Sequence, residues 1–184
     1  MRIIAGSARG REISAPKGLE TRPVTDIIRE SLFNIWQFDV PGGVFLDLFA
    51  GSGQIGIEAL SRGADCVYFF EPDRSAFQTL QKNLTHAKAD GRAKPYPAPY
   101  ARLASVFPKP RFDLVYIDPP YQSGAYEEAL KFLVEGGYLH DGSTVICEAE
   151  AKEPLPERVG FLSDSPRRYG RVALHVYRKK EDEG

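Results

Sequence analysis

The residues with the clearest chemical potential form the stretch Asp118-Pro-Pro-Tyr121, which directly follows an apolar run. Pro119 and Pro120 fix the backbone in a non-helical step and remove two N–H donors, so the loop presents acceptors: the Asp118 carboxylate and the Pro119 carbonyl. Two acceptors that take both N–H bonds of an exocyclic aryl amine would aim the nitrogen lone pair at a methyl donor. Tyr121 offers a flat face on which a base could stack. The alternative interpretation is a strand-ending turn with an incidental aromatic side chain.

A second stretch places an acid directly before a glycine-rich loop, in Asp47-Leu-Phe-Ala-Gly-Ser-Gly-Gln-Ile-Gly56. Its Gly-x-Gly-x-x-Gly spacing is a weak signal, because dinucleotide-binding folds and many plain turns share it. Asp47 discriminates between the ligands: it would repel a pyrophosphate and attract the cationic amino and sulfonium end of S-adenosylmethionine (SAM). The sequence therefore favours SAM over NAD.

Glu71 follows the next apolar run along the chain. A carboxylate at this place could accept hydrogen bonds from both ribose hydroxyls of an adenosyl group. The alternative is an acid favoured by the dipole at a helix start, a role that Asp73 could fill equally well.

The elements that must position these residues alternate along the chain. We expect strands at 44–48, 66–70, 112–117, 143–148 and 172–177, and helices at 54–62, 73–84 and 126–134. The proline-rich stretch 95–99 makes the third unit hard to assign. Successive strand–helix units predict an α/β fold with a mostly parallel sheet and helices on both faces. Ligands of such sheets bind beyond the carboxyl ends of the strands, where Asp47, Glu71 and Asp118 fall.

Before this alternation lies a different region. Residues 2–13 have the pattern of two short strands around a glycine-containing turn. Thr25 or Asp26 can cap a helix that runs to about Gln37, with an apolar stripe formed by Ile28, Leu32, Ile35 and Trp36. The break at 41–43 then predicts an extension over residues 1–40 and a main domain over residues 41–184.

Composition limits the class of protein. The 184 residues are 42% hydrophobic and 27% charged, which is typical of one globular domain. No apolar run approaches the length of a membrane-spanning helix and no secretory signal is present, so we expect a cytoplasmic protein. Cys66 and Cys147 fit small buried hydrophobic residues. The histidines lack ligand spacing, so we expect no metal: His86, His140 and His175.

The charge is unevenly distributed, although the net charge is −1. Residues 1–22 carry five basic and two acidic side chains, and residues 166–180 carry six basic and no acidic ones. A chain that is basic at both ends can present one positive face to phosphates. Ordinary solvated surface charges remain the alternative.

Together these residues resemble a known family. Asp47 to Gly53 and Asp118 to Tyr121 resemble the SAM-binding and catalytic motifs of class I amino-methyltransferases. The flanking segments are similar to the RsmD family of bacterial 16S rRNA guanine-N2 methyltransferases, and they are the specific part of the likeness: Met1–Gly6, Arg9–Arg11, Thr21–Pro23, Arg29–Asn34, Gly56–Ala64 and Arg168–Gly170.

The resemblance implies a Rossmann-like, seven-stranded sheet with an N-terminal hairpin-and-helix extension. It implies methyl transfer from SAM to N2 of a guanine in 16S rRNA, guanine 966 in the family, within the assembled 30S subunit. Three groups of residues carry over: catalytic Asp118, Pro119, Pro120 and Tyr121; cofactor-binding Asp47, Phe49, Gly51, Gly53, Gln54 and Glu71; and RNA-binding Arg9, Arg11, Thr21, Arg22 and Arg168. We expect a monomer, since no coiled-coil or surplus amphipathic pattern asks for a partner.

One departure from the family concerns the cofactor. Many members carry an Asp after the third strand that contacts the adenine amino group, whereas Tyr96-Pro-Ala-Pro-Tyr100 holds no carboxylate. Backbone groups or stacking would then hold the adenine.

Two rival functions remain. DNA adenine and cytosine amino-methyltransferases share the Asp-Pro-Pro-Tyr motif, but they need a target-recognition insertion and base flipping, and 184 residues leave little room. A non-catalytic SAM- or RNA-binding assembly factor would not need the amine-acceptor loop.

Overall fold

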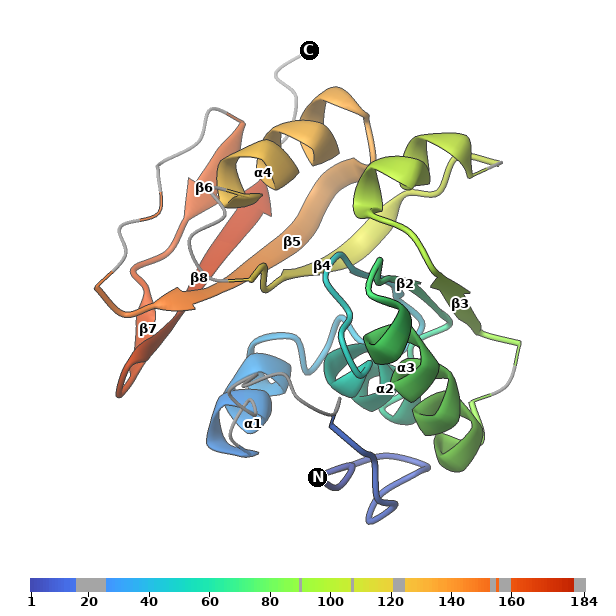
Figure 1. The fold of residues 1–184 in the computed structure, drawn as a ribbon. Coiled ribbons are helices and arrows are strands. Elements are labelled where there is room, and N and C mark those ends of the chain that lie inside the picture. Colours follow the sequence, from blue (N-terminus) through green and yellow to red (C-terminus); the bar gives the residue numbers. More distant parts are fainter. Residues whose placement is uncertain are drawn as a thin grey trace. The chain divides into compact units, whose positions relative to one another are not determined.

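The structure, a computed structural model, describes residues 1–15, 26–89, 91–106, 108–120, 125–152, 155 and 160–180. The chain forms two compact units, Met1–Tyr100 and Ala101–Gly184 (Figure 1). The predicted division at residue 40 stays a prediction.

The first unit is built around three parallel strands. Its elements are α1 (Asp26–Ile35), β1 (Val44–Asp47), α2 (Gln54–Ser61), β2 (Cys66–Phe70), α3 (Arg74–Ala87) and β3 (Ala93–Tyr96). Strand β2 lies between β1 and β3, with Asp47 opposite Phe69 and Phe70 opposite Tyr96. The carboxyl ends of the three strands are therefore neighbours, as the parallel arrangement requires.

Close packing of α2 on the sheet depends on Gly56. A Cβ at this position would lie 2.2 Å from Cε1 of Phe69 and 2.9 Å from Cγ1 of Val67, so any side chain would push the helix away. The next helix, α3, is capped by Asp73, whose carboxylate accepts a hydrogen bond from the Ala76 N–H at 2.8 Å.

Residues 1–15 fold back on themselves in a hairpin-like course, but the two predicted strands do not form. One antiparallel bridge joins Arg2 and Glu12, and the N–H of Ile3 donates to the carbonyl of Arg11 at 3.0 Å. The residues between these two positions turn toward α2 instead, because side chains of that helix accept hydrogen bonds from their N–H groups. The Glu58 carboxylate accepts from Ile4 at 2.8 Å and Ala5 at 2.9 Å.

The second unit is a mixed sheet. After the 3-10 helix Tyr100–Ser105 come β4 (Phe112–Ile117), α4 (Ala125–Glu135), β5 (Leu139–Glu150), β6 (Phe161–Ser163), β7 (Arg167–Tyr169) and β8 (Val172–Lys179). Strands β4 and β5 are parallel, whereas β8 is antiparallel to β5, β6 and β7. Helix α4 packs on this sheet (Figure 1).

The described residues thus contain eight strands, not the predicted seven. Strands β6 and β7 were missed because they are three residues long and mostly exposed, so they lack an apolar alternation. Strand β5 is twelve residues long, twice the predicted length. The predicted stripe of α1 is largely confirmed: Ile28, Leu32 and Trp36 are buried, whereas Ile35 is partly exposed and Phe33 is buried beside them.

No helix in the described ranges is long and apolar enough to cross a membrane.

Glu58 should be the main anchor of the N-terminal segment. Its buried carboxylate also accepts from Nε of Arg62 at 2.8 Å, so Glu58→Gln would face three donors with one acceptor oxygen. We expect a loss of about 2 kcal/mol in the free energy of unfolding, measured by urea denaturation. Glu30→Gln, on an exposed position of α1, is the control and should change stability by under about 0.5 kcal/mol. Equal free energies of unfolding for the two variants would contradict the role of Glu58 as the anchor of the N-terminal segment.

Candidate functional site

The glycine loop that follows β1 is held by backbone hydrogen bonds. The N–H of Ala50 donates to Phe70 at 3.0 Å and that of Gly53 donates to Ala50 at 2.7 Å. Gly51 and Gly53 have φ of 52° and 80°, a region that disfavours other residues. A Cβ on Gly53 would lie 2.2 Å from Cδ1 of Leu80, whereas one on Gly51 would meet no heavy atom within 4 Å. Gly51 therefore leaves space in which a ligand could approach the backbone.

Asp47 lies at the end of β1 and is 2% exposed. Burial is the main cause that raises its pKa to about 7; the nearby charge of Glu71 adds to this, and backbone hydrogen bonds from Gly56 and Phe49 oppose it. Its Oδ1 has no hydrogen-bond partner among the described residues. A buried, unpartnered carboxylate oxygen fits a cationic ligand, as the ammonium and sulfonium of SAM require.

Glu71 lies at the neighbouring strand end. Its Oε2 accepts from the N–H of Gly51 at 2.8 Å and its Oε1 from that of Asp73 at 2.7 Å. Burial is the first cause that raises its pKa. Each oxygen keeps a further lone pair, so the carboxylate fits ribose hydroxyls and also shapes the loop. The helix-capping alternative is filled by Asp73.

Gln54, the first residue of α2, is engaged with α1. With its amide oxygen turned toward Arg29, it accepts from Nη1 at 2.9 Å and from Nε at 3.1 Å. Arg29 is fully buried and also donates to Oδ1 of Asp26 at 2.6 Å. The burial of this cation could not be predicted from the sequence, because Arg29 occupies a helical position from which its side chain could equally reach solvent.

Aromatic side chains surround the ends of β2 and β3. The ring of Tyr96 stacks on Phe70, with centroids 4.9 Å apart, and Phe49 packs edge-on against Tyr100 at 5.4 Å. The N–H of Glu71 donates to the carbonyl of Tyr96 at 3.1 Å. This region offers rings and backbone groups, and residues 96–100 include no carboxylate.

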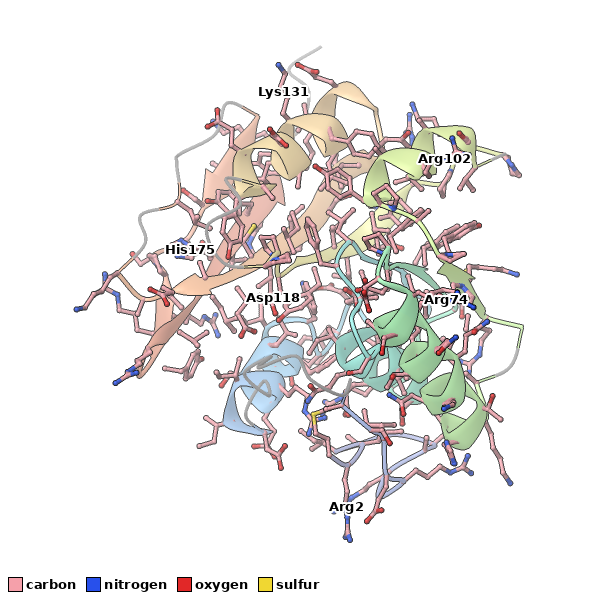
Figure 2. The ribbon with its side chains drawn as sticks, viewed as in Figure 1. Arg2, Arg74, Arg102, Asp118, Lys131 and His175 are labelled. Atoms are coloured by element: carbon pink, nitrogen blue, oxygen red, sulfur yellow. The ribbon has the colours of Figure 1, made fainter. Side chains whose placement is uncertain are left out.

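In the second unit, Asp118 directly follows β4 and is partly buried (Figure 2). Pro119 is buried and Pro120 is exposed, while Tyr121 lies outside the described residues. Both flanks of the stretch attach to β5 at one residue. The hydroxyl of Tyr116 donates to Oε2 of Glu148 at 2.5 Å, and that of Tyr126 donates to the Glu148 carbonyl at 2.7 Å. Sequence reasoning missed Glu148; burial raises its pKa.

The basic residues expected to face RNA lie in both units. Arg9 is exposed, and Arg11 donates to the carbonyl of His86 at 3.4 Å. Arg168 is exposed in β7, and two more exposed arginines, Arg167 and Arg171, lie beside it around the turn into β8. Thr21 and Arg22 lie outside the described residues.

No group of three or more metal-ligating side chains gathers within the part of the chain that the structure describes. Both cysteines are unbridged; Cys147 is buried as expected, and Cys66 is only partly so.

Comparison with known proteins settles the family. A family model described as "Conserved hypothetical protein 95" matches residues 1–178. The chain belongs to this family. Among curated RsmD-family relatives, the Bacillus subtilis "Putative rRNA methyltransferase YlbH" is 37% identical and covers 98% of this chain and 100% of its own. The Escherichia coli (strain K12) "Ribosomal RNA small subunit methyltransferase D" is 35% identical over 98% of this chain and 90% of its own.

Solved structures agree with the family. "Putative methyltransferase yhhF from Escherichia coli" superposes with a TM-score of 0.85 at 35% identity, over 99% of each chain. The resemblance to the RsmD family and the Rossmann-like class I methyltransferase fold are therefore confirmed.

The raised pKa of Asp47 should make stability depend on pH. The folded state holds the proton more tightly than the unfolded chain, so stability is fully present below pH 3.8 and is lost as pH rises through about 7. Between pH 5 and 7 this group should lower the free energy of unfolding by about 1.4 kcal/mol per pH unit. Urea denaturation should show this slope in the wild type and its loss in Asp47→Asn. Parallel pH profiles of the two proteins would refute the burial of a titrating carboxyl group.

Proposed function

We propose that this chain transfers a methyl group from SAM to the exocyclic N2 of a guanine in 16S rRNA. The observation that carries the proposal is the nearly full-length match to the Escherichia coli small subunit methyltransferase D. The buried acid before the glycine loop and the acceptor-only Asp118 stretch supply the chemistry that such a reaction needs.

The first unit would hold the cofactor. Asp47 would pair with its cationic end, Gly51 would let it approach the backbone, and Glu71 would accept hydrogen bonds from the ribose. Phe49 and the rings at the end of β3 would bound the adenine in place of a carboxylate. Gln54 would contribute through its backbone at the start of α2, since its side chain is bonded to Arg29.

The stretch after β4 would hold the target amine. The Asp118 carboxylate and Pro119 carbonyl would accept its two N–H bonds, which orients the nitrogen lone pair for attack on the methyl carbon. Bound SAM supplies an electrophilic methyl group on a good leaving group, so orientation is the main task left to the protein. Pro120 would keep the step rigid, and Tyr121 would stack on the base.

The substrate would be the assembled 30S subunit, modified at guanine 966 by a cytoplasmic monomer. RNA presents such bases in loops, where they are accessible without opening a duplex. Arg9, Arg11 and Arg168, with Thr21 and Arg22, would contact its phosphates.

Transfer of labelled methyl groups tests this function. Purified protein is incubated with labelled SAM and 30S subunits that lack the modification, beside naked 16S rRNA and duplex DNA. We expect label in 30S, recovered as N2-methylguanosine after digestion. Label in DNA would favour an amino-methyltransferase of DNA, and binding of SAM without any transfer would favour a non-catalytic assembly factor.

Asp118→Ala should lower the turnover number in that assay by about 10²–10³-fold, because it removes one of two amine acceptors. Calorimetry should find SAM affinity within about twofold of the wild type, since Asp118 would contact the amine. Asp141→Ala, an exposed acid of the same unit, is the matched control. Normal methylation by Asp118→Ala would overturn the catalytic role.

Charge reversal of Arg9 and Arg11 should weaken binding to 30S subunits and leave SAM binding intact. Each lost phosphate contact should reduce the slope of log affinity against log salt concentration by about one. Lys131→Glu, on an exposed position of α4, serves as the control. An unchanged salt slope in the double variant would show that the N-terminal segment does not contact the RNA.

A further inference from the structure

Asn83 is a buried amide that no part of the proposed reaction uses. It lies on α3 and is 1% exposed. Its Oδ1 accepts from the N–H of Ser14 at 2.8 Å, and its Nδ2 donates to the carbonyl of Ser14 at 2.8 Å and to that of Ser52 at 2.9 Å. Ser14 belongs to the N-terminal segment and Ser52 to the glycine loop. One side chain therefore bonds two stretches that are far apart in the sequence.

The bond to Ser52 completes the fixation of the glycine loop. A peptide group is planar, so fixing its carbonyl oxygen and its N–H fixes the orientation of the whole plane. The Ser52 carbonyl is held by Asn83, and the N–H of the same peptide group, on Gly53, is held by Ala50 at 2.7 Å. The N–H two residues earlier, on Gly51, donates to the Glu71 carboxylate. Asn83 and Glu71 thus each hold one peptide plane of the loop, the 52–53 plane and the 50–51 plane, with one peptide group between them.

The N-terminal segment in turn supports Asn83. The two bonds with Ser14 use the amide oxygen and one amide hydrogen, which leaves the other hydrogen directed at Ser52. Ser14 is itself held in place because Ile13 is buried and donates its N–H to the Met1 carbonyl at 2.9 Å. Loss of the segment's bonds would free the amide to rotate away from the loop.

We propose that Asn83 is a positioning residue for the cofactor loop, and that the N-terminal segment acts through it as part of the cofactor site. The inference rests on the proposed function, which assigns the glycine loop to SAM and the segment to RNA. Cofactor affinity then depends on residues that contact no cofactor. Order in the segment and order in the loop rise together, because both depend on the same amide.

Asn83→Asp separates this role from simple packing. The two side chains have nearly the same shape, but a carboxylate cannot donate to the carbonyls of Ser14 and Ser52. The probe is S-adenosylhomocysteine, titrated by calorimetry, with the melting temperature measured in parallel. We expect its Kd to rise at least about tenfold in the variant. Asn34→Asp makes the same change at an exposed position of α1 and should leave the Kd within about twofold.

Hydrogen exchange of the wild type keeps the test independent of how well the variant folds. S-adenosylhomocysteine should slow exchange at the Ser14 N–H as well as in residues 48–56, since the ligand stabilises the loop that shares Asn83. Protection confined to 48–56, or an Asn83→Asp Kd equal to that of Asn34→Asp, would overturn the inference. A wild type that binds no S-adenosylhomocysteine would instead overturn the proposed function, and this inference with it.

Discussion

The first unit depends on how the polar groups of one short glycine loop are satisfied. A loop with glycines at two of its positions has few side chains of its own to fill space, so its shape is set largely by the groups around it. Two side chains do most of this: Glu71 accepts from the N–H of Gly51, and Asn83 donates to the carbonyl of Ser52. Glu71 comes from the adjacent strand end, whereas Asn83 comes from the middle of a helix. The loop is thus rigid because sheet and helix both hold it.

The ends of strands could be predicted well from the sequence, since an apolar run that stops at an acid and glycines is a local signal. Asp47 ends strand β1, and Gly51, Glu71 and Asp118 follow strands, as predicted. Asn83 and Glu58 could not be recognised, because their partners lie 69 and 54 residues away and each looks like an ordinary polar helix position. The sequence pattern predicted five of the eight strands; β3 runs into a proline-rich stretch, and β6 and β7 are too short and too exposed to leave a pattern.

The charge of Glu71 helps to raise the pKa of Asp47 at the neighbouring strand end, and the fold satisfies the two carboxyl groups unequally. Glu71 receives two backbone N–H groups through its two oxygens and remains suited to accept more. Asp47 is deeper, with one oxygen that no described residue partners. Such an arrangement is unfavourable for the free protein and becomes favourable when a cation supplies the missing partner. Functional sites commonly lower the stability of the free protein in this way in exchange for ligand binding.

A carboxyl group with a pKa near 7 also responds to small changes in the charge beside it. Methyl transfer removes the positive charge from the sulfur of the cofactor, so the proposed ligand of Asp47 is less cationic after the reaction than before it. Asp47 would then regain a proton more readily, and its attraction for the spent molecule would weaken. The burial of Asp47, which lowers the stability of the free protein, would thereby lower the affinity for the demethylated product relative to SAM and favour product release.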